Sequence, residues 1–454
     1  MELFGLADCN NFYCSCERVF HPDLRNKPVV VLSNNDGCVI ARSEESKALG
    51  IKMGDVFYQV KDVLEKNGVA VFSSNYNLYG DMSRRVMSLL STYTPKLDIY
   101  SIDEAFLDLT GMGDMEYLSS YCKQMVRDIT KGTGIPISLG VAPTKTLAKL
   151  ASKYAKKHKG YEGVCFIDTE EKRKKALKLF PVEDVWGIGY RHAKKLAYHG
   201  IHTAWDLTQR SESWIRKELT ITGVRTWKEL RGESCIEMED ETYKKSICTS
   251  RSFPDQGLDK LEDVEEAVAN FAAKCSKKLR EQHTVCGSIV VFAYTSRFRE
   301  DMPQTYINEM VNFDVPTNDV QEIVSKAVAA LRNAWRKGTY YYKKAGVVAC
   351  NICEDNAIQG NLFDTVDRDK QSALSKVVDE INMRNGVDTV RIAVQGYNNN
   401  WHIKNEYISK QYTTTITMAG HFKPKFEHKL SLIIPSCHGF LKRLTACNCT
   451  PKFI

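Results

Sequence analysis

Apolar and polar positions alternate with two different periods along the first third of the chain, and together they predict an α/β fold. Short apolar or β-branched runs indicate strands, whereas apolar residues that recur every three or four positions indicate helices. Glycine or a polar cluster, such as the segment 33–37, bounds many of these runs. The expected strands are 3–7, 28–32 and 137–141, and the expected helices are 12–20, 44–49, 81–90, 115–130 and 144–156.

Two acidic residues interrupt the strand pattern near position 100. The segments 98–102 and 105–109 are both strand-like, and only Asp103 and Glu104 separate them. So short a connection predicts a hairpin with both carboxylates at or beside its turn. Asp8 follows the first expected strand. We therefore expect Asp8, Asp103 and Glu104 to converge on neighbouring strands of one sheet.

The pattern changes twice further along the chain. The segment 170–233 is helical and basic, which predicts a small helical domain. After about Tyr243, strand-like and helical segments alternate, which predicts a separate α+β domain. The strand-like segments are 246–253, 286–294 and 345–352, and the helical ones are 264–282 and 319–337. Beyond Asn356 the regularity weakens and no element is predicted.

Length and composition set broad limits on the class of protein. A chain of 454 residues is too long for one hydrophobic core, so three or four domains are expected. No apolar run approaches the ~18 residues that would span a bilayer. The first residues also lack the basic and apolar regions of an export signal. These features predict a cytoplasmic protein with no membrane partner.

The net charge bears on the kind of partner, and the cysteine content bears on disulfides and zinc binding. The net charge of +7 favours a polyanionic partner, and basic residues cluster at 145–159, 172–178 and 191–195. The fifteen cysteines are scattered through a long chain, which favours reduced thiols over a disulfide framework. The pairs Cys14/Cys16 and Cys447/Cys449 lack the two-residue gap of a zinc knuckle.

Asp8, Asp103 and Glu104 are the candidate reactive residues. Phosphoryl transfer to a 3′-hydroxyl uses two divalent cations about 4 Å apart, held by carboxylates. Mg²⁺ prefers oxygen ligands, so these side chains and one backbone carbonyl, that of Cys9, would suffice. The alternative is that an Asp-Glu pair in a turn is simply solvated, and spacing alone does not separate the two interpretations.

Several motifs resemble those of one enzyme family. The segment 101–109, Ser-Ile-Asp-Glu-Ala-Phe-Leu-Asp-Leu, resembles the acidic palm motif of Y-family DNA polymerases. Asp8 before Asn11-Phe12-Tyr13 resembles their first motif, and 32–42 is similar to the fingers of UmuC-type members. Further matches at 72–79, 141–149 and 184–189 extend the resemblance to all but the C-terminal tail.

The resemblance implies a multidomain α/β and α+β fold, a right-hand polymerase with palm, fingers, helical thumb and β-rich little finger. The implied boundaries are 1–11 and 78–168 for the palm, 12–77 for the fingers, 169–240 for the thumb, 241–353 for the little finger and 354–454 for a C-terminal region.

The resemblance also assigns roles around the acidic residues. Asp8, Asp103 and Glu104, with the Cys9 carbonyl, would hold two Mg²⁺ ions. Tyr13 would be the steric gate, whose ring excludes a ribose 2′-hydroxyl. Without the resemblance, a tyrosine near a strand end indicates ordinary packing.

Further nucleotide contacts follow from the same resemblance. Phe12 would stack beneath the sugar, and Lys47 and Lys156, the latter with Lys149 behind it, would contact the triphosphate. A solvated basic helix face is the alternative for these lysines. Archaeal relatives bind phosphates with a threonine and a tyrosine of the fingers, where this chain has Ala41 and Glu44. Triphosphate binding should therefore depend more on the lysines and on backbone amides.

The turn Trp186-Gly187-Ile188-Gly189 resembles a helix-hairpin-helix, in which glycine lets backbone amides approach a DNA phosphate. Gly187, Gly189 and Lys194 are the DNA contacts expected in the thumb, although a Gly-x-Gly motif alone is a weak signal. The little finger should grip the duplex chiefly through phosphates, with salt-sensitive and sequence-tolerant binding.

The segment Gln359-Gly360-Asn361-Leu362-Phe363 resembles the peptide that binds the bacterial sliding clamp. Gln359 would fix the backbone, and Leu362 and Phe363 would enter a hydrophobic pocket. A linker or packing turn is the alternative. The other implied partners are primer-template DNA, dNTPs, a UmuD-type dimer and a RecA filament. The tail from about Ala419, with His421 and His438, departs from the UmuC pattern and has no assigned role.

The function expected from the sequence is error-prone, template-directed DNA synthesis across damaged DNA, as in SOS mutagenesis. A non-catalytic DNA-binding subunit of a repair complex is one rival, but it would tolerate loss of an acidic ligand, and all three are present. A nucleotide cyclase is another, but it needs no thumb, little finger or clamp peptide, and Tyr13 would oppose its ribose.

Overall fold

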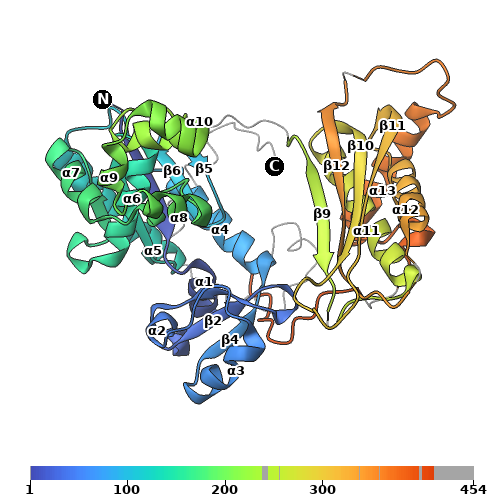
Figure 1. Ribbon diagram of the computed structural model, residues 1–454, viewed down its shortest axis with the longest axis horizontal. Helices are drawn as coiled ribbons and strands as arrows, with labels where there is room; N and C mark the ends of the chain where they lie inside the picture. Colours follow the sequence, from blue (N-terminus) through green and yellow to red (C-terminus); the bar gives the residue numbers. More distant parts are fainter. Residues whose placement is uncertain are drawn as a thin grey trace, which may run out of the picture. The chain divides into compact units, whose positions relative to one another are not determined.

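The protein is described by a computed structural model that covers residues 2–237, 244–254, 256–336, 338–356, 358–397 and 401–413. The chain forms two compact units, Met1–Ser409 and Lys410–Ile454. All helices and strands named below belong to the first unit, which contains three sheets (Figure 1). No helix in these ranges is long and apolar enough to cross a membrane. The tail from Ala419, with His421 and His438, lies outside the described residues.

A five-stranded sheet with the order β5-β6-β1-β7-β8 places β1 at its centre. β1 pairs with antiparallel neighbours on both sides, so Asp8 lies opposite Glu104 of β6 and Ser138 of β7. Helices α5 and α6 pack on this sheet. The bounds are β1 (Phe4–Cys9), β5 (Leu97–Ile99), β6 (Glu104–Asp108), β7 (Ile137–Ala142), β8 (Val164–Phe166), α5 (Met115–Thr133) and α6 (Lys145–Lys157).

A three-stranded sheet has the order β3-β2-β4, and its residues Val30 and Leu32 share an apolar core with Leu64 of the helix α3. The expected helix over 12–20 is present. The helix expected at 81 begins at Tyr76 instead, because the Asn75 side chain accepts the Leu78 N–H and caps an earlier turn. The bounds are α1 (Phe12–Phe20), β2 (Val29–Leu32), β3 (Val39–Arg42), α2 (Glu44–Ala48), α3 (Phe57–Lys66), β4 (Ala70–Ser73) and α4 (Tyr76–Leu90).

The segment 170–230 is helical, as its pattern predicts. Its helices bury Leu196, Leu207 and Trp227 in a core that also includes residues of α6. The bounds are α7 (Glu170–Leu179), α8 (Tyr190–Tyr198), α9 (Ala204–Thr208) and α10 (Glu212–Leu230).

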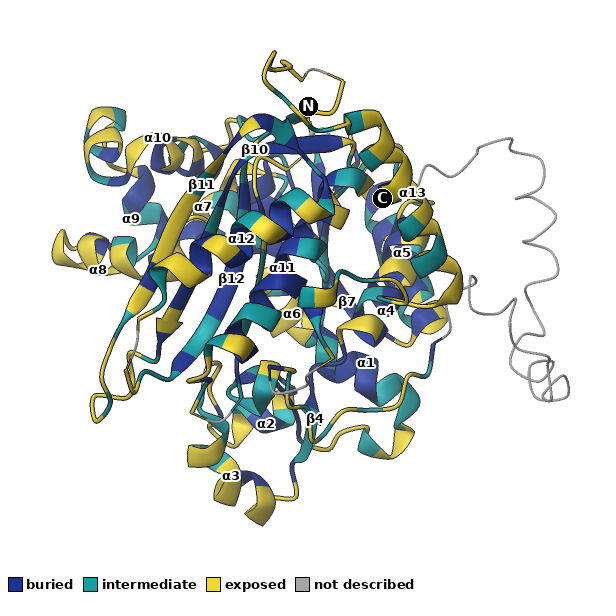
Figure 2. Cartoon of the chain, turned by 90° about the vertical axis from the view of Figure 1, so that its right-hand side faces the viewer, coloured by how far each residue is buried: buried dark blue, intermediate teal, exposed yellow. Residues whose placement is uncertain are grey.

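A four-stranded antiparallel sheet has the order β11-β10-β12-β9, and helices α11 and α12 cover one of its faces (Figures 1 and 2). The sequence pattern did not predict β11. That strand contains buried residues such as Ile307 and Phe313 and exposed ones such as Tyr306 and Asn308. Because many of its residues are polar, the apolar pattern of a strand could not be recognised in the sequence. The bounds are β9 (Ile247–Ser252), β10 (Thr284–Thr295), β11 (Tyr306–Thr317), β12 (Tyr342–Glu354), α11 (Leu261–Glu281) and α12 (Val320–Ala334).

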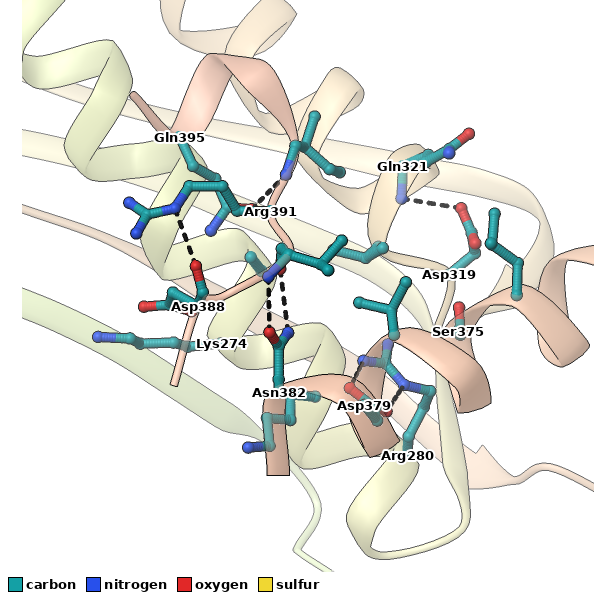
Figure 3. Close-up of a pocket in the computed structure, with 17 residues that line it drawn as sticks. Lys274, Arg280, Asp319, Gln321, Ser375, Asp379, Asn382, Asp388, Arg391 and Gln395 are labelled. Atoms are coloured by element: carbon teal, nitrogen blue, oxygen red, sulfur yellow. Dashed lines mark hydrogen bonds and ion pairs between the residues drawn. The ribbon is translucent and has the colours of Figure 1, made fainter. Parts of the chain in front are cut away.

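Helix α13 (Arg368–Asn385) lies where no element was predicted. It encloses a cavity of about 350 Å³ together with α11, α12 and residues 388–395 (Figure 3). Arg280 of α11 makes two hydrogen bonds to the Asp379 carboxylate, at 2.7 and 2.9 Å, and these fasten α13 to the sheet's helical layer. Asn382 also exchanges hydrogen bonds with the backbone of Val390.

Helix α6 approaches β7 closely at Gly140. A Cβ at this position would collide with the backbone of Ala148 and Ser152 in α6. We expect Gly140→Ala to reduce the free energy of unfolding by about 1–3 kcal/mol, because the helix must move away from the sheet. Thermal and urea unfolding would measure the loss.

Gly80→Ala in α4 is the matched control, since a Cβ at Gly80 meets nothing within 4 Å and alanine favours helices. Equal stability of the two variants would contradict the close packing at Gly140.

Candidate active site

The acidic hairpin differs from its prediction in one respect. β5 ends at Ile99 and β6 begins at Glu104, so residues 100–103 form the turn and Glu104 is a strand residue. The prediction of a strand to Ile102 followed by a two-residue turn was wrong. The Ser101 hydroxyl stabilises the longer turn: it accepts the N–H of Glu104 at 3.0 Å and donates to the Asp103 carboxylate at 2.7 Å.

The end of β1 meets this hairpin directly. Asp8 is the register partner of Glu104, and the Cys9 N–H donates to the Asp103 carbonyl at 2.8 Å. The three acidic residues therefore occupy adjoining backbone positions at one end of the sheet, as predicted. Alternate residues of a strand share a face, so Asp8 points to the same side as Phe4 and Leu6, which pack with α6.

A cavity of about 380 Å³ opens at this end of the sheet. It brings together residues from β1, α1, the three-stranded sheet, the hairpin and α6. The predicted site residues that line it are Asp8, Cys9, Phe12, Tyr13, Lys47, Asp103 and Lys156. Glu104 does not line this cavity. Arg42 and Met53 do line it. Arg42 ends the segment 32–42 that resembles the fingers, but neither residue was predicted as a site residue.

Two lysines of α6 pair with the carboxylates. Lys156 Nζ lies 2.9 Å from Asp8 Oδ1, and Lys149 Nζ lies 2.8 Å from Glu104 Oε2. Both lysines project from the helix that packs over the face of Asp8 and Glu104. The site thus has compensating positive charge already in place beside its acidic residues.

Burial raises the pKa of the Glu104 carboxyl; the hydrogen bond and charge of Lys149 oppose this rise, whereas Asp8 and Asp103 add to it. The pKa of the Cys9 thiol is also raised, chiefly by burial and then by Asp103 and Asp8. The thiol therefore stays protonated, and the backbone carbonyl is the atom that Cys9 can offer to a hard cation.

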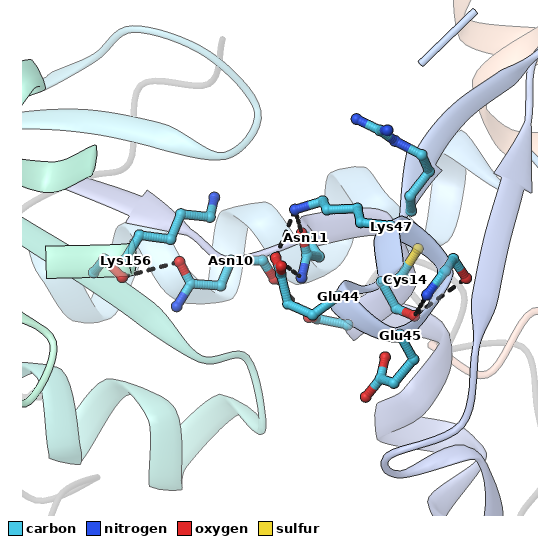
Figure 4. Close-up of polar contacts among 12 residues, drawn as sticks. Asn10, Asn11, Cys14, Glu44, Glu45, Lys47 and Lys156 are labelled. Carbon is cyan, nitrogen blue, oxygen red and sulfur yellow. Dashed lines mark hydrogen bonds and ion pairs between the residues drawn. The ribbon is translucent and has the colours of Figure 1, made fainter. Parts of the chain in front are cut away.

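Lys47 is held on the other side of the cavity by a small polar network (Figure 4). Its Nζ lies 2.6 Å from Glu44 Oε1 and 2.8 Å from Asn11 Oδ1, and Asn11 Nδ2 donates to Glu44 at 3.1 Å. Partial burial acts to raise the pKa of Glu44, but the hydrogen bonds from Lys47 and Asn11 bring it below its usual value. Glu44, to which the sequence assigned no role, orients Lys47.

The Tyr13 ring lies in an aromatic cluster built on two helices. It stacks on Tyr79 of α4 with a centroid distance of 4.4 Å and an interplanar angle of 15°. Tyr76 contacts it edge-on at 6.1 Å. Burial, then Tyr76 and Asp103, raise the pKa of Tyr13 to about 12, so its hydroxyl stays protonated at neutral pH. Tyr79 and Tyr76 therefore hold the Tyr13 ring in place at the border of the cavity.

The three acidic side chains have the right ligand atoms for a divalent cation, because all of them offer the oxygen atoms that Mg²⁺ prefers. Within the described ranges, no three His, Cys, Asp or Glu side chains are gathered as a ready-made metal site. Lysines hold two of the carboxylates instead. Asp8, Asp103 and Glu104 remain the predicted ligands, and a cation would compete with Lys149 and Lys156 for them.

Three family models match the chain. Residues 7–153 match the impB/mucB/samB family, 244–362 match the C-terminal domain of that family, and 372–417 match a domain of unknown function, DUF4113. Protein UmuC of Salmonella typhimurium strain LT2 is 43% identical over 415 residues, which are 91% of this chain and 98% of UmuC. Protein ImpB of Salmonella typhimurium is 42% identical over 418 residues, 91% of this chain and 97% of ImpB. The chain belongs to the impB/mucB/samB family.

More distant relatives and solved structures agree with this assignment. DNA polymerase IV of Acetivibrio thermocellus is 27% identical over 397 residues, 85% of this chain and 95% of that polymerase. A Y-family DNA polymerase chimera of Dbh and Dpo4 shares the fold with a TM-score of 0.64, at 21% identity over 78% of this chain and 99% of the chimera. A ternary complex of Dbh matches with a TM-score of 0.53, at 21% identity over 77% of this chain and 99% of Dbh. The predicted family and fold class are confirmed: the chain is a UmuC-type, Y-family DNA-directed DNA polymerase.

The other predicted contacts of the polymerase lie outside the cavity. Gly187 adopts a φ of +88°, which favours glycine, and a Cβ there would lie 2.8 Å from Thr226 Oγ1. Gly189 is the N-cap of α8, whose surface carries the exposed Lys194. In the predicted clamp peptide, Gln359 is exposed, and Leu362 and Phe363 are 100% and 87% exposed.

Proposed function

We propose that the polymerase performs error-prone, template-directed synthesis across damaged DNA by two-metal nucleotidyl transfer at Asp8, Asp103 and Glu104. The observation that carries the proposal is the meeting of β1 with the acidic hairpin. There, Asp8 and Asp103 border the same cavity as Tyr13, Lys47 and Lys156. Primer extension with Mg²⁺ on undamaged and abasic templates tests it.

The side chains around the cavity divide the work of binding a nucleotide. When bound, two Mg²⁺ ions would activate the primer hydroxyl and neutralise triphosphate charge. Lys47 and Lys156 supply mobile positive charges for the phosphate oxygens. Both are held by acidic partners in the structure, Glu44 and Asp8, and an arriving triphosphate would exchange those partners for its own oxygens.

Sugar selection falls to the wall of the cavity nearest α1. Phe12 is buried, and its ring lies 5.8 Å from that of Tyr13. Phe12 would support the sugar from below, while the Tyr13 ring would clash with a ribose 2′-hydroxyl. A rigid ring rejects a larger substrate because it cannot move aside, and the stack on Tyr79 supplies that rigidity.

DNA binding outside the cavity would come from the helical and β-rich regions. Gly187 and Gly189 precede α8 and have no side chains to keep a DNA phosphate away from the backbone. The first N–H groups of α8 and the Lys194 ammonium group could then bind that phosphate. Binding through phosphates is insensitive to sequence and weakens with salt. Such binding fits a polymerase that must act at any damaged site.

The clamp peptide offers a separate prediction. Leu362 and Phe363 are almost fully exposed, which is unfavourable unless a partner covers them. We expect the double variant Leu362→Ala with Phe363→Ala to weaken binding to a bacterial sliding clamp by roughly a hundredfold, since two buried anchors are lost. Surface plasmon resonance on immobilised clamp would measure the change.

Val387→Ala is the matched control, because Val387 is also exposed but lies outside the peptide. Clamp-free primer extension should be unaffected in both variants. Equal clamp affinity for the double variant and the parent would show that this peptide does not bind the clamp.

Recruitment in the cell would also involve a UmuD-type dimer and a RecA filament, in the setting of SOS mutagenesis. This part of the proposal rests on membership of the UmuC-type family. The rival, a non-catalytic DNA-binding subunit, would bind primer-template without extending it. The two are separated by measuring binding and extension on the same DNA.

A further inference from the structure

The segment 401–409 belongs to the stretch that matches the domain of unknown function, 372–417. Its first residue, Trp401, is buried against Phe271 of α11, with ring centroids 5.7 Å apart, and donates its indole N–H to Glu266. Of its last four residues, 406–409, three contact elements more than three hundred positions away in sequence: Glu406, Tyr407 and Ser409. We call these four residues the strap.

The strap closes an edge of the three-stranded sheet. The Tyr407 N–H donates to Ser73 Oγ at 2.9 Å, and the Ser73 N–H donates to the Tyr407 carbonyl at 3.0 Å. Ser73 is the last residue of β4, an edge strand. The Tyr407 ring packs edge-on against Phe57, and the Glu406 N–H donates to Asp36 at 2.8 Å. The strap is therefore bonded to the sheet through its backbone as well as its side chains.

Ser409 connects the two helices behind the sugar-selecting ring. Its hydroxyl donates to Glu17 Oε1 of α1 at 3.1 Å. Asn75, which caps α4, donates its side-chain N–H to the Ser409 carbonyl at 3.2 Å and to its hydroxyl at 3.0 Å. One strap residue thus holds both the middle of α1 and the first turn of α4.

Glu17 links Ser409 to the aromatic rings beside the cavity. Its Oε1 also accepts the Tyr79 hydroxyl at 2.7 Å, and Tyr79 is the ring on which Tyr13 stacks. Glu17 and Tyr13 are four residues apart on α1 and so share a helix face. Glu17 is fully buried, and its second oxygen has no hydrogen-bond partner in the described structure. Because the buried Glu17 carboxyl has few hydrogen-bond partners, losing one of the remaining hydrogen bonds costs more free energy than it would at the surface.

We propose that the strap positions Tyr13 by holding together the helix that carries it and the helix that carries its stacking partner Tyr79. The inference rests on the proposed function, because it takes Tyr13 as the gate against ribose. It adds to that function by giving the segment of unknown function a part in sugar selection. Glu17, Tyr79 and Ser409 are positioning residues, since none of them lines the cavity.

The test compares sugar selectivity in Ser409→Ala with that of the parent. The variant loses two hydrogen bonds of the hydroxyl, one to Glu17 and one from Asn75. The ratio of kcat/KM for dNTP to that for rNTP is expected to fall roughly three- to tenfold, which is the effect of about one net hydrogen bond on the placement of the Tyr13 ring. The fall should come mainly from faster ribonucleotide use. Ser409→Thr retains the hydroxyl and should restore the ratio. Ile408→Ala is the matched control, since that side chain is 52% exposed.

A second readout needs no catalysis. Hydrogen exchange should quicken in the first turn of α4 in Ser409→Ala but not in Ile408→Ala, because Asn75 loses a partner. Unchanged exchange in Ser409→Ala would overturn the proposal, whether or not the protein is active. The proposal would also be overturned if Ser409→Ala kept the selectivity ratio of the parent while Tyr13→Ala lost most of it. Equal losses with both nucleotides that Ser409→Thr does not restore would indicate a general structural role, which also contradicts it. A Tyr13→Ala protein with normal selectivity would instead refute Tyr13 as the gate.

Discussion

Asp103→Asn is expected to lower the rate of primer extension by on the order of a thousandfold or more, because a neutral amide oxygen binds a divalent cation much more weakly than a carboxylate does. Asp103 borders the cavity, and its backbone carbonyl is bonded to the Cys9 N–H. Asparagine keeps the shape of the side chain and can still accept the Ser101 hydroxyl, so the hairpin should survive. Single-turnover extension with saturating Mg²⁺ and dNTP measures the effect.

Asp62→Asn is the matched control for this change. Asp62 lies on α3 and is exposed, so the same chemical substitution falls far from the acidic hairpin. Both variants should unfold at the temperature of the parent and bind primer-template equally well. An Asp103→Asn protein that extends primers within tenfold of the Asp62→Asn rate would remove Asp103 from the metal site.

Tyr13→Ala is expected to raise ribonucleotide incorporation by roughly a hundredfold or more relative to deoxyribonucleotide incorporation. The ring excludes the 2′-hydroxyl by a steric clash, and its removal leaves space for the larger sugar. Tyr79 and Tyr76 would remain in place, but neither lines the cavity. Competition between dNTP and rNTP on one template gives the selectivity directly.

Tyr13→Phe separates the ring from its hydroxyl. It retains the stack on Tyr79, and we expect parent-like selectivity from it. A Tyr13→Phe protein that accepts ribonucleotides as readily as Tyr13→Ala would mean that the hydroxyl, not the ring, makes the discrimination. Unchanged selectivity in Tyr13→Ala would place the gate elsewhere in the cavity.

The sequence predicted those features that depend on local patterns. Strand β1, helix α1 and helix α6 follow directly from apolar spacing, and the acidic motif identified the residues that the β1–β6 register brings together. The resemblance of residues 101–109 to the palm motif was more informative than periodicity, because without it a simply solvated acidic turn was the favoured interpretation.

Two kinds of feature were not predicted: a helix with a weak apolar pattern, and pairs of residues that meet only in the folded chain. Helix α13 has mixed polar and apolar residues, but Leu374, Val378 and Ile381 recur at helical spacing, and this signal could have located it. Nothing in the sequence indicated that Lys149 would pair with Glu104 or that Ser409 would reach Glu17. Such pairs join residues 45 and 392 positions apart, and only the folded chain brings them together.

The most direct test of the central claim is primer extension by the parent protein on an abasic template, with Mg²⁺ and then with chelator. It should be run with and without sliding clamp, UmuD-type partner and RecA filament, and binding to the same primer-template should be measured alongside. Extension past the abasic site is expected; it should need Mg²⁺ and be lost in Asp103→Asn. Tight primer-template binding without any extension under all of these conditions would contradict it, and would favour a non-catalytic DNA-binding subunit.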